Sequence, residues 1–224
     1  MGDGKRGVAL VFAGGDPPVP AELDGLPDAD LVIAADSGLH HASALGRRVD
    51  VVVGDLDSAD PALVERLEAA GTRIDRHPVD KEASDTELAV HAALAGGADR
   101  VDLLGATGGD RLDHELANLL LLADPALSGV ELRAVVAGTT IRAARGGDVL
   151  TLRGDPGDLV TLLPISGDAG GVTTAGLRWA LDGSTLPMGG SRGLSNVVVE
   201  SGASVRLTEG VLLVIETAST GEQA

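Results

Sequence analysis

The chain of 224 residues is 44% hydrophobic and 23% charged, and it contains no cysteine. This length fits one large domain or two modest ones. Without cysteine there is no disulfide, thiolate metal site or cysteine nucleophile, which favours a reducing compartment. The 17 basic and 34 acidic residues give a net charge of −17, which argues against a surface for nucleic acids or anionic membranes. One phenylalanine, one tryptophan and no tyrosine exclude an aromatic platform for single-stranded bases.

No segment approaches the roughly 18–20 consecutive apolar residues that a membrane span needs. The apolar run at residues 8–13 is short and leads directly into Gly14, Gly15 and Asp16. This favours a buried first strand and its turn over a signal peptide. We therefore expect a soluble, cytoplasmic protein with no membrane partner.

Residues 7–137 alternate between short apolar runs and helix-like stretches. The runs, which we expect to be strands, lie at residues 8–13, 31–35, 51–53, 101–104 and 130–137, with a weaker one at 72–76. Strands separated by helices are typical of an open, mostly parallel sheet covered on both faces. The sequence therefore predicts an α/β N-terminal domain over residues 1–137.

Three of the intervening helices have recognisable ends. The first begins at Asp60-Pro61 and ends at Gly71. The second begins at Ser84, which forms a capping box with Glu87, and ends at Gly96-Gly97. The third begins at Asp110 or Asp113 and gathers leucines on one side, namely Leu112, Leu116, Leu119 and Leu120.

After residue 138 the helical signals disappear. Short apolar runs recur between glycine-rich turns, at residues 149–152, 159–163, 172–174, 197–200, 205–207 and 211–217. Such closely spaced strands predict an all-β C-terminal domain over residues 138–224, either a sandwich or a small barrel. Charge divides with the fold, since residues 1–137 carry a net −14 and residues 138–224 a net −3.

Four of the predicted strands end in clusters of glycine and aspartate, at residues 13–16, 35–38, 54–58 and 105–110. In open α/β sheets, ligands bind just beyond the carboxyl ends of the strands. Glycine lets the backbone approach a ligand closely, and the following helix N-termini favour anions. One such cluster could be an ordinary turn, but four on one edge predict a binding site.

Asp55 and Asp57 flank Leu56, so in an extended loop both carboxylates can point the same way. Paired carboxylates suit Mg²⁺, which keeps several waters and binds substrate phosphates. The alternative is a solvated turn with a helix cap at Ser58. Lys81, four residues before Asp85, favours the magnesium interpretation because it adds a phosphate-seeking ammonium beside a metal-seeking carboxylate.

The glycine turn at residues 108–109 leads into Arg111, Asp113 and His114. If a helix starts there, Arg111, His114 or Glu115, and Asn118 share a face opposite the leucines. A local ion pair is the alternative interpretation of Arg111 and Asp113, and a solvent-facing position is the alternative for Asn118.

Common site fingerprints are missing from the sequence. There is no phosphate-binding Gly-x-x-x-x-Gly-Lys-Ser/Thr. The pattern Gly-x-Gly-x-x-Gly occurs only at residues 2–7, before the first predicted strand, and Gly-x-Ser-x-Gly only at residues 189–193, in the predicted all-β domain. Neither follows a strand and opens a helix, as the dinucleotide fingerprint and the nucleophile elbow require. The five histidines lack zinc spacing.

Taken in order, three of these motifs resemble the thiamine pyrophosphokinase family. They are Gly54-Asp-Leu-Asp-Ser58, Lys81 with Ser84-Asp-Thr-Glu87, and Gly108-Gly-Asp-Arg-Leu-Asp-His-Glu-Leu-Ala-Asn118. Segments 160–164, 176–179 and 193–196 are similar to that family's β-domain markers. The resemblance implies an α/β ATP-binding domain, a thiamine-binding β-sandwich through which a homodimer forms, and Mg²⁺-dependent pyrophosphoryl transfer from ATP to thiamine.

The resemblance also implies roles for individual residues. Asp55, Asp57 and Asp85 would hold the magnesium and, with Arg111 and Asp113, form the catalytic set. The nucleotide would be contacted by Asp36, Lys81, Thr86, Arg111, His114 and Asn118. Ser195 and Asn196 would hold thiamine, between the two domains and across the dimer interface.

Some positions depart from the family pattern. His40 stands where many members have asparagine, Asp110 is inserted before Arg111, and Val197 replaces a frequent acid. Residues 211–216 lack the aromatic on which some members stack thiamine, and Trp179 is expected to pack in a core or interface instead.

In the implied reaction, the primary alcohol of thiamine attacks the β-phosphorus of ATP and releases AMP. Such a transfer needs mainly alignment and neutralised charge, and a domain of net −14 needs a metal to host a polyphosphate. Asp85 and Asp113 are the candidate proton acceptors. Two alternatives remain open: a sibling kinase acting on another small alcohol, and a non-catalytic regulator that binds nucleotide or thiamine.

Overall fold

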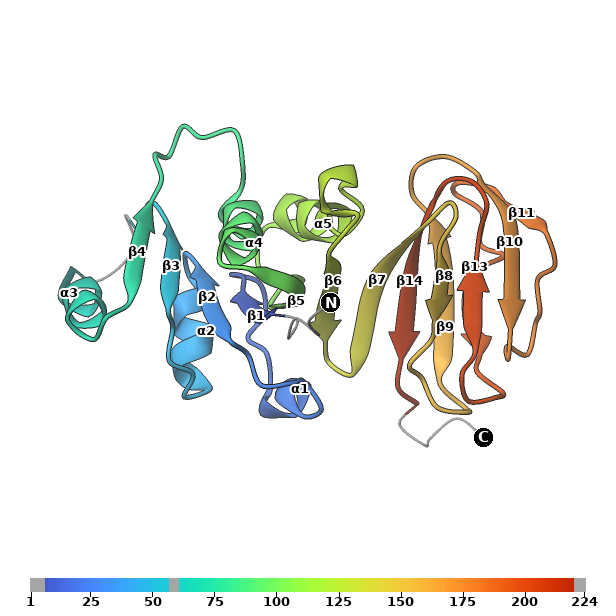
Figure 1. Cartoon of the computed structure of the whole chain (residues 1–224), viewed down its shortest axis with the longest axis horizontal. Helices are drawn as coiled ribbons and strands as arrows, with labels where there is room; N and C mark the ends of the chain where they lie inside the picture. The colour runs from blue at the N-terminus through green and yellow to red at the C-terminus, as the bar shows by residue number, and fades with distance from the viewer. Residues whose placement is uncertain (1–6, 57–60, 220–224) are drawn as a thin grey trace, which may run out of the picture. The chain divides into compact units, whose positions relative to one another are not determined.

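The computed structural model describes residues 7–56 and 61–219 (Figure 1). The chain divides into two compact units, Met1–Ala137 and Gly138–Ala224, which we call the α/β unit and the β unit. No helix in the described residues is both long and apolar enough to cross a lipid bilayer.

The α/β unit contains the strands β1 (Gly7–Phe12), β2 (Leu31–Ala35), β3 (Val51–Gly54), β4 (Arg73–Arg76), β5 (Ala98–Leu104) and β6 (Glu131–Val136). They lie in the order β4-β3-β2-β1-β5-β6, and every neighbouring pair is parallel. The order reverses beside β1, which has β2 on one side and β5 on the other. Such a reversal leaves a crevice at the carboxyl ends of the two central strands. The predicted α/β domain with a mostly parallel sheet is confirmed.

Helices cover this sheet (Figure 1). They are α1 (Pro20–Leu23), α2 (Gly38–Ala44), α3 (Pro61–Ala69), α4 (Asp85–Ala95), α5 (Leu112–Leu121) and the 3-10 helix η1 (Pro125–Leu127). Leu10 and Phe12 of β1 pack in a core with Leu39 of α2 and Val64 of α3. Val11 points to the opposite face because side chains alternate along a strand. Helix α4 packs across β1, β2 and β5.

The helix starts agree only partly with the sequence prediction. Ser84 caps α4, and its Oγ accepts a 3.1 Å hydrogen bond from Glu87 N, as the capping sequence predicts. The predicted cap at Asp60 lies outside the described residues. Helix α5 begins at Leu112, between the two predicted starts. Helix α2 has no counterpart in the prediction.

The leucine side of α5 is exposed, and Asn118, on the opposite side, is buried. Leu112, Leu116 and Leu120 are 66%, 53% and 54% exposed, whereas Asn118 is only 7% exposed. A solvent-facing Asn118 is therefore wrong. The reason is a polar neighbour: the Asn118 Nδ2 group donates a 2.9 Å hydrogen bond to the carbonyl oxygen of buried Ala106. Helix α5 turns its amide, and not its leucines, toward the polar loop after β5.

The β unit is a sandwich of two antiparallel sheets. One contains β7 (Thr139–Arg145), β9 (Leu159–Pro164), β12 (Asn196–Val197) and β14 (Val211–Thr217), in the order β12-β9-β14-β7. The other contains β8 (Val149–Thr151), β10 (Ala169–Ala175), β11 (Ser184–Leu186) and β13 (Ser204–Arg206), in the order β11-β10-β13-β8. Both sheets contribute to one core, for example through Leu162 and Leu212 from the first and Val172 and Val205 from the second. The predicted all-β sandwich is confirmed.

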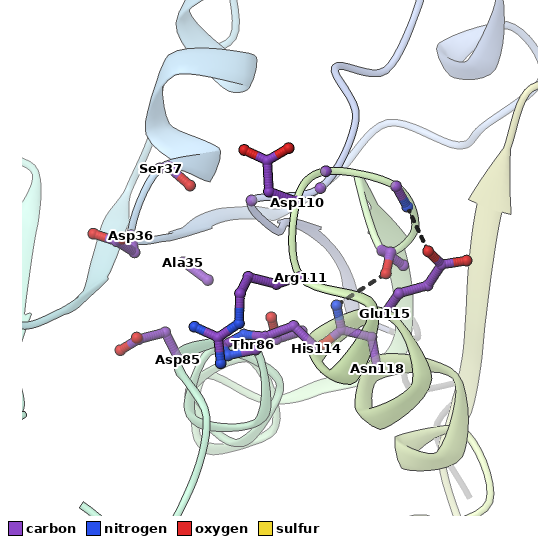
Figure 2. Close-up of a pocket in the computed structure, with 15 residues that line it drawn as sticks. Ala35, Asp36, Ser37, Asp85, Thr86, Asp110, Arg111, His114, Glu115 and Asn118 are labelled. Atoms are coloured by element: carbon purple, nitrogen blue, oxygen red, sulfur yellow. Dashed lines mark hydrogen bonds between the residues drawn. The ribbon is translucent and has the colours of Figure 1, made fainter. Parts of the chain in front are cut away.

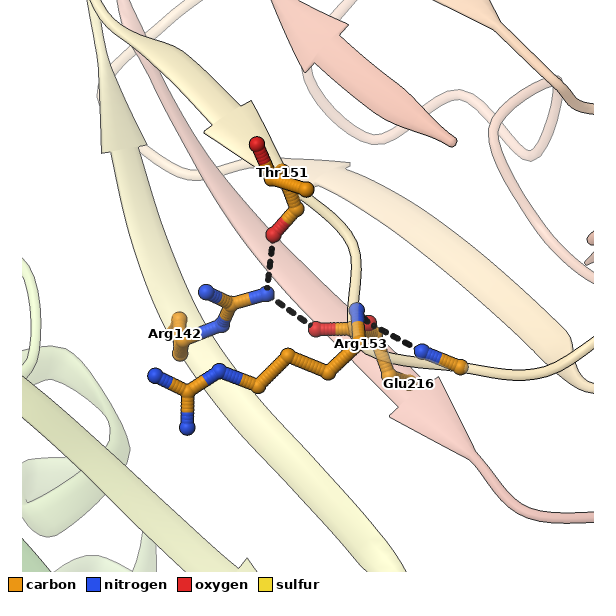
Figure 3. A network of polar contacts seen from close by, with 5 residues as sticks. Arg142, Thr151, Arg153 and Glu216 are labelled. Atoms are coloured by element: carbon orange, nitrogen blue, oxygen red, sulfur yellow. Dashed lines mark hydrogen bonds and ion pairs between the residues drawn. The ribbon is translucent and has the colours of Figure 1, made fainter. Parts of the chain in front are cut away.

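A buried polar network joins the two sheets of the sandwich (Figure 3). The carboxylate of Glu216 in β14 pairs with Arg142 in β7, and each residue is less than 10% exposed. The other carboxylate oxygen accepts hydrogen bonds from the backbone N–H groups of Arg153 and Gly154. Arg142 donates to the carbonyl of Thr151 at 2.9 Å. Since residues 151–154 leave the second sheet, this network ties that segment to the first sheet.

Candidate active site

A pocket of about 270 Å³ opens at the carboxyl ends of β1, β2 and β5 (Figure 2). Its walls come from the loops after these strands, the start of α4 and one face of α5. Three of the four glycine and aspartate clusters noted in the sequence contribute to it, at residues 14–15, 35–37 and 106–110. The pocket occupies the crevice that the strand order creates, the usual place for a ligand in such a sheet.

Glycine is required where the loops after β1 and β5 touch. A Cβ atom on Gly15 would lie 2.2 Å from the carbonyl oxygen of Thr107. Instead, Gly15 N donates to Gly105 O at 2.9 Å, and Asp16 N donates to Thr107 O at 2.8 Å. The two loops therefore form one continuous wall of the pocket.

Two aspartates line the pocket on the same side (Figure 2). Asp36 follows β2 with φ at +45°, and Asp85 is the first residue of α4. A Cβ atom on Gly54 would lie 3.4 Å from Asp85 Oδ1 and 3.5 Å from Asp36 Cα. Both distances are ordinary van der Waals contacts, so the end of β3 lies directly beside both residues.

Lys81 pairs with Asp85 before α4 begins. Its Nζ atom lies 2.7 Å from Asp85 Oδ1, and its side chain is 14% exposed. The predicted juxtaposition of an ammonium and a carboxylate is therefore present, although Lys81 itself does not line the pocket.

The predicted magnesium ligands are only partly covered by the structure. Asp55 follows Gly54 at the end of β3 and is half-buried, whereas Asp57 lies outside the described residues. Among the residues with described positions, no three His, Asp or Glu side chains gather closely enough to hold a metal. The set of Asp55, Asp57 and Asp85 stays a prediction.

Arg111 and Asp113 form the local ion pair that the sequence left as an alternative. Arg111 Nε lies 2.9 Å from Asp113 Oδ1, and the guanidinium NH2 lies 2.7 Å from Oδ2. This hydrogen-bonded contact lowers the pKa of the Asp113 carboxyl to about 2 and raises the pKa of Arg111. Arg111 lines the pocket, but Asp113 does not. So acidic a carboxyl is a poor proton acceptor.

The remaining predicted nucleotide contacts line the pocket together. Thr86 is 8% exposed at the start of α4, and His114 and Asn118 lie on the inner face of α5. Glu115 shares that face and accepts a 3.1 Å hydrogen bond from Gly108 N (Figure 2). Ser37 also lines the pocket and was not singled out from the sequence, where only its place between aspartate and glycine after a strand marks it.

The predicted thiamine residues lie in the β unit. Asn196 is 8% exposed; its Oδ1 accepts from Trp179 N at 3.0 Å, and its Nδ2 donates to Trp179 O at 2.8 Å. Ser195 has φ at +56°, and its N–H donates to Thr161 Oγ1 at 3.0 Å. Trp179 is 57% exposed, with the Arg178 guanidinium 5.7 Å from its ring centre. It is therefore not a core residue of its unit, and Asn196 fixes the backbone that presents it.

Comparison with known families matches both units. Residues 24–134 match the sequence model of the thiamin pyrophosphokinase catalytic domain, and residues 148–212 match that of the thiamin pyrophosphokinase vitamin B1 binding domain. The chain belongs to the thiamin pyrophosphokinase family. The family's catalytic-domain match contains most of the pocket, and its binding-domain match contains Ser195 and Asn196.

Whole-chain relatives in the thiamin pyrophosphokinase family agree. The chain is 25% identical over 208 residues to thiamine pyrophosphokinase of Bacillus subtilis, covering 92% of this chain and 97% of the relative. The crystal structure of the Bacillus subtilis enzyme superposes with a TM-score of 0.82 at 24% identity, covering 95% of this chain and 99% of the other. Thiamin pyrophosphokinase of Geobacillus thermodenitrificans gives a TM-score of 0.80 at 25% identity, covering 96% and 99%. The family and the fold expected from the motifs are confirmed.

Proposed function

We propose that this protein is a thiamine diphosphokinase, which transfers the pyrophosphoryl group of ATP to the hydroxyl of thiamine. The observation that carries the proposal is the pocket at the sheet switch point. It combines Asp36, Asp85 and Arg111 inside a segment that matches a thiamin pyrophosphokinase catalytic domain. A vitamin B1 binding domain match in the same chain supports thiamine as the acceptor.

The reaction is an in-line displacement at the β-phosphorus. The thiamine hydroxyl oxygen forms a bond to that phosphorus, the bond from the β-phosphorus to the α,β-bridging oxygen breaks, and AMP leaves with that oxygen. Arg111 would neutralise charge on the phosphates, held in orientation by its two contacts to Asp113. Thr86, His114 and Asn118 would line the nucleotide site.

The hydroxyl proton needs an acceptor. Of the two candidates, Asp113 has a pKa of about 2 because Arg111 binds its charged form. Asp85 lines the pocket, but it pairs with Lys81 and is also a proposed magnesium ligand, so the same argument applies to it and no acceptor is assigned. Lys81, at 2.7 Å from Asp85, would balance its charge and attract the phosphates.

We propose that Mg²⁺ is held by Asp55, Asp57 and Asp85. The donor chemistry fits a hard cation, since these groups are carboxylates and the end of β3 approaches the Asp85 carboxyl closely. When bound, the ion would offset phosphate charge in a pocket that is itself rich in aspartate.

We also propose a homodimer formed through the β unit, in which Ser195 and Asn196 contribute to thiamine binding. Large apolar side chains are exposed on that unit, among them Trp179, Met188 and Val199. Exposed groups of this kind are typical of protein interfaces. Sedimentation analysis of the full chain tests this proposal. If the protein sediments only as a monomer, the homodimer is excluded.

The test of the activity is an AMP assay with magnesium, ATP and a panel of vitamins. Release of AMP with thiamine alone supports the proposal, while release with a different alcohol points to a sibling kinase. Tight ATP binding without turnover points to a regulator. Asp57→Asn should abolish turnover, whereas the matched change Asp28→Asn, at an exposed loop aspartate, should not. An active Asp57→Asn enzyme would show that the magnesium assignment is wrong.

A further inference from the structure

The loop after β5, residues 105–110, which we call the glycine loop, is held through backbone groups of five consecutive residues, 105–109; the contact at Gly105 is described above. Asn118 Nδ2 donates to Ala106 O at 2.9 Å, and Asp16 N donates to Thr107 O at 2.8 Å. Gly108 N donates to Glu115 Oε2 at 3.1 Å, and Gly109 N donates to Asp16 Oδ1 at 2.9 Å. Asp16 therefore binds the loop twice, once through its backbone and once through its carboxylate.

These contacts determine which groups the glycine loop can offer to a ligand. Adjacent backbone N–H groups in a glycine turn form an anion site when they are free. Here the N–H groups of Gly108 and Gly109 are both engaged by carboxylates of the protein itself. The positive charge that the loop brings to the pocket is then the side chain of Arg111, which directly follows it.

Asp16 binds the glycine loop from outside the pocket. It is exposed and does not line the pocket, whereas Gly108 and Gly109 do. A Cβ atom on Gly108 would lie 2.1 Å from Asp16 Oδ2, so the carboxylate and the loop backbone are in direct contact. The loop has φ near +77° at both glycines, a conformation that glycine adopts readily, so the hydrogen bonds, and not backbone strain, select one arrangement of the loop.

We propose that Asp16 is a positioning residue, whose carboxylate fixes the glycine loop so that Arg111 is placed for the phosphates of ATP. This proposal rests on the proposed kinase function. It assigns Asp16 no contact with ATP or metal, and that distinguishes it from the aspartates that line the pocket. Its essential property is an oxygen acceptor of the right length and not its negative charge.

The experiment compares Asp16→Ala, Asp16→Asn and the control Asp28→Ala. Removing the acceptor in Asp16→Ala should lower kcat/KM for ATP by about 10- to 100-fold, since a misplacement of about 1 Å can cost about 10²-fold. Asp16→Asn keeps an acceptor of the same shape, so we expect it to stay within about threefold of the wild type, although a neutral hydrogen bond is weaker. KM for thiamine should be unchanged in both. Asp28→Ala should behave as the wild type because Asp28 is not among the residues that line the pocket or bind the glycine loop.

Amide hydrogen exchange of the full chain supplies a readout besides activity. Exchange in the peptide containing residues 105–110 should become faster in Asp16→Ala and remain near the wild-type rate in Asp16→Asn, with β14 as an internal reference. Equal damage from Asn and Ala would show that the charge itself acts, and would overturn the proposal. Unchanged kinetics or unchanged loop exchange in Asp16→Ala would also overturn it.

Two further outcomes are distinguishable. If the wild type releases no AMP, the proposed function fails, while loop exchange and the calorimetric affinity for ATP still test Asp16. If Asp16→Ala does not fold, Asp16→Ser replaces it in the comparison. Serine keeps a polar side chain at this position, but its hydroxyl is too short to reach Gly109.

Discussion

Replacing Asn118 by alanine should destabilise the α/β unit more than replacing Leu120 by alanine, although both residues lie in α5. Asn118 is 7% exposed and donates to the carbonyl of Ala106, which is fully buried. Its removal leaves that carbonyl without this donor, at a cost of about 1–3 kcal/mol in the free energy of unfolding. Leu120 is 54% exposed, so about half of a leucine's burial energy of about 1.5–3 kcal/mol is at stake. Helix propensity favours alanine at both sites and partly offsets each loss.

The two units can be followed separately in one urea titration of the full chain. Every helix in the described residues belongs to the α/β unit, so far-ultraviolet circular dichroism near the helix bands reports mainly on that unit. Trp179 is the only tryptophan and lies in the β unit, so its fluorescence should keep the wild-type midpoint in both variants.

A larger loss from Leu120→Ala than from Asn118→Ala would refute the orientation of α5. The leucine pattern alone predicts that result, since a fully buried leucine costs about 2–5 kcal/mol when truncated to alanine. A shifted Trp179 midpoint would show instead that the substitutions act through the β unit.

Glu216→Ala should lower the stability of the β unit by about 3–5 kcal/mol, because its arginine partner is left buried and unpaired; a tryptophan-fluorescence midpoint near the wild type would contradict this. Asp113→Asn should lower kcat without moving the acidic limb of the pH profile. The depressed pKa keeps Asp113 charged until the pH falls toward about 2, so a shifted limb would show that Asp113 is the titrating base. Gly108→Ala should reduce kcat/KM for ATP about tenfold more than Gly109→Ala, equal to about 1.4 kcal/mol. Both have φ at +77°, but only a Cβ at 108 meets Asp16 at 2.1 Å, and equal losses would show that this contact is unimportant.

The parallel sheet could be predicted from the sequence because strands that are buried on both faces consist of unbroken runs of apolar residues. The runs at residues 8–13 and 31–35 coincide closely with β1 and β2. Helix α2 could not be predicted from the sequence because it has only seven residues and no side-chain cap at its first turn. Short helices of this kind are stabilised by packing on the sheet, which the local sequence does not show.

The facing of α5 follows from the family resemblance, which assigns His114 and Asn118 to the nucleotide, and both line the pocket. The spacing alone could not predict it, because amphipathicity tells which residues share a side and not what that side meets. Asn118 does lie opposite Leu112, Leu116 and Leu120, as its spacing requires. What the helix packs against is the backbone of the loop after β5, whose polar carbonyl at Ala106 selects the amide face. The ion pair of Arg142 and Glu216 could not be predicted from a local sequence pattern either, because the two residues are 74 positions apart.

The acidic excess of residues 1–137 likewise does not show which carboxylates lie at the candidate site. A net charge of −14 indicates that a metal must accompany a polyphosphate only if the carboxylates face it. In the structure these carboxylates have different surroundings. Asp36, Asp85 and Asp110 line the pocket, while Asp16 binds the glycine loop and Asp102 is fully buried between arginines. Asp102 adds little repulsion to a bound anion because Arg100 and Arg133 offset its charge. Asp16 keeps its charge, since the group that donates to its carboxylate is a neutral backbone N–H. The proposed nucleotide would therefore meet only part of the −14, and the composition alone does not say which part.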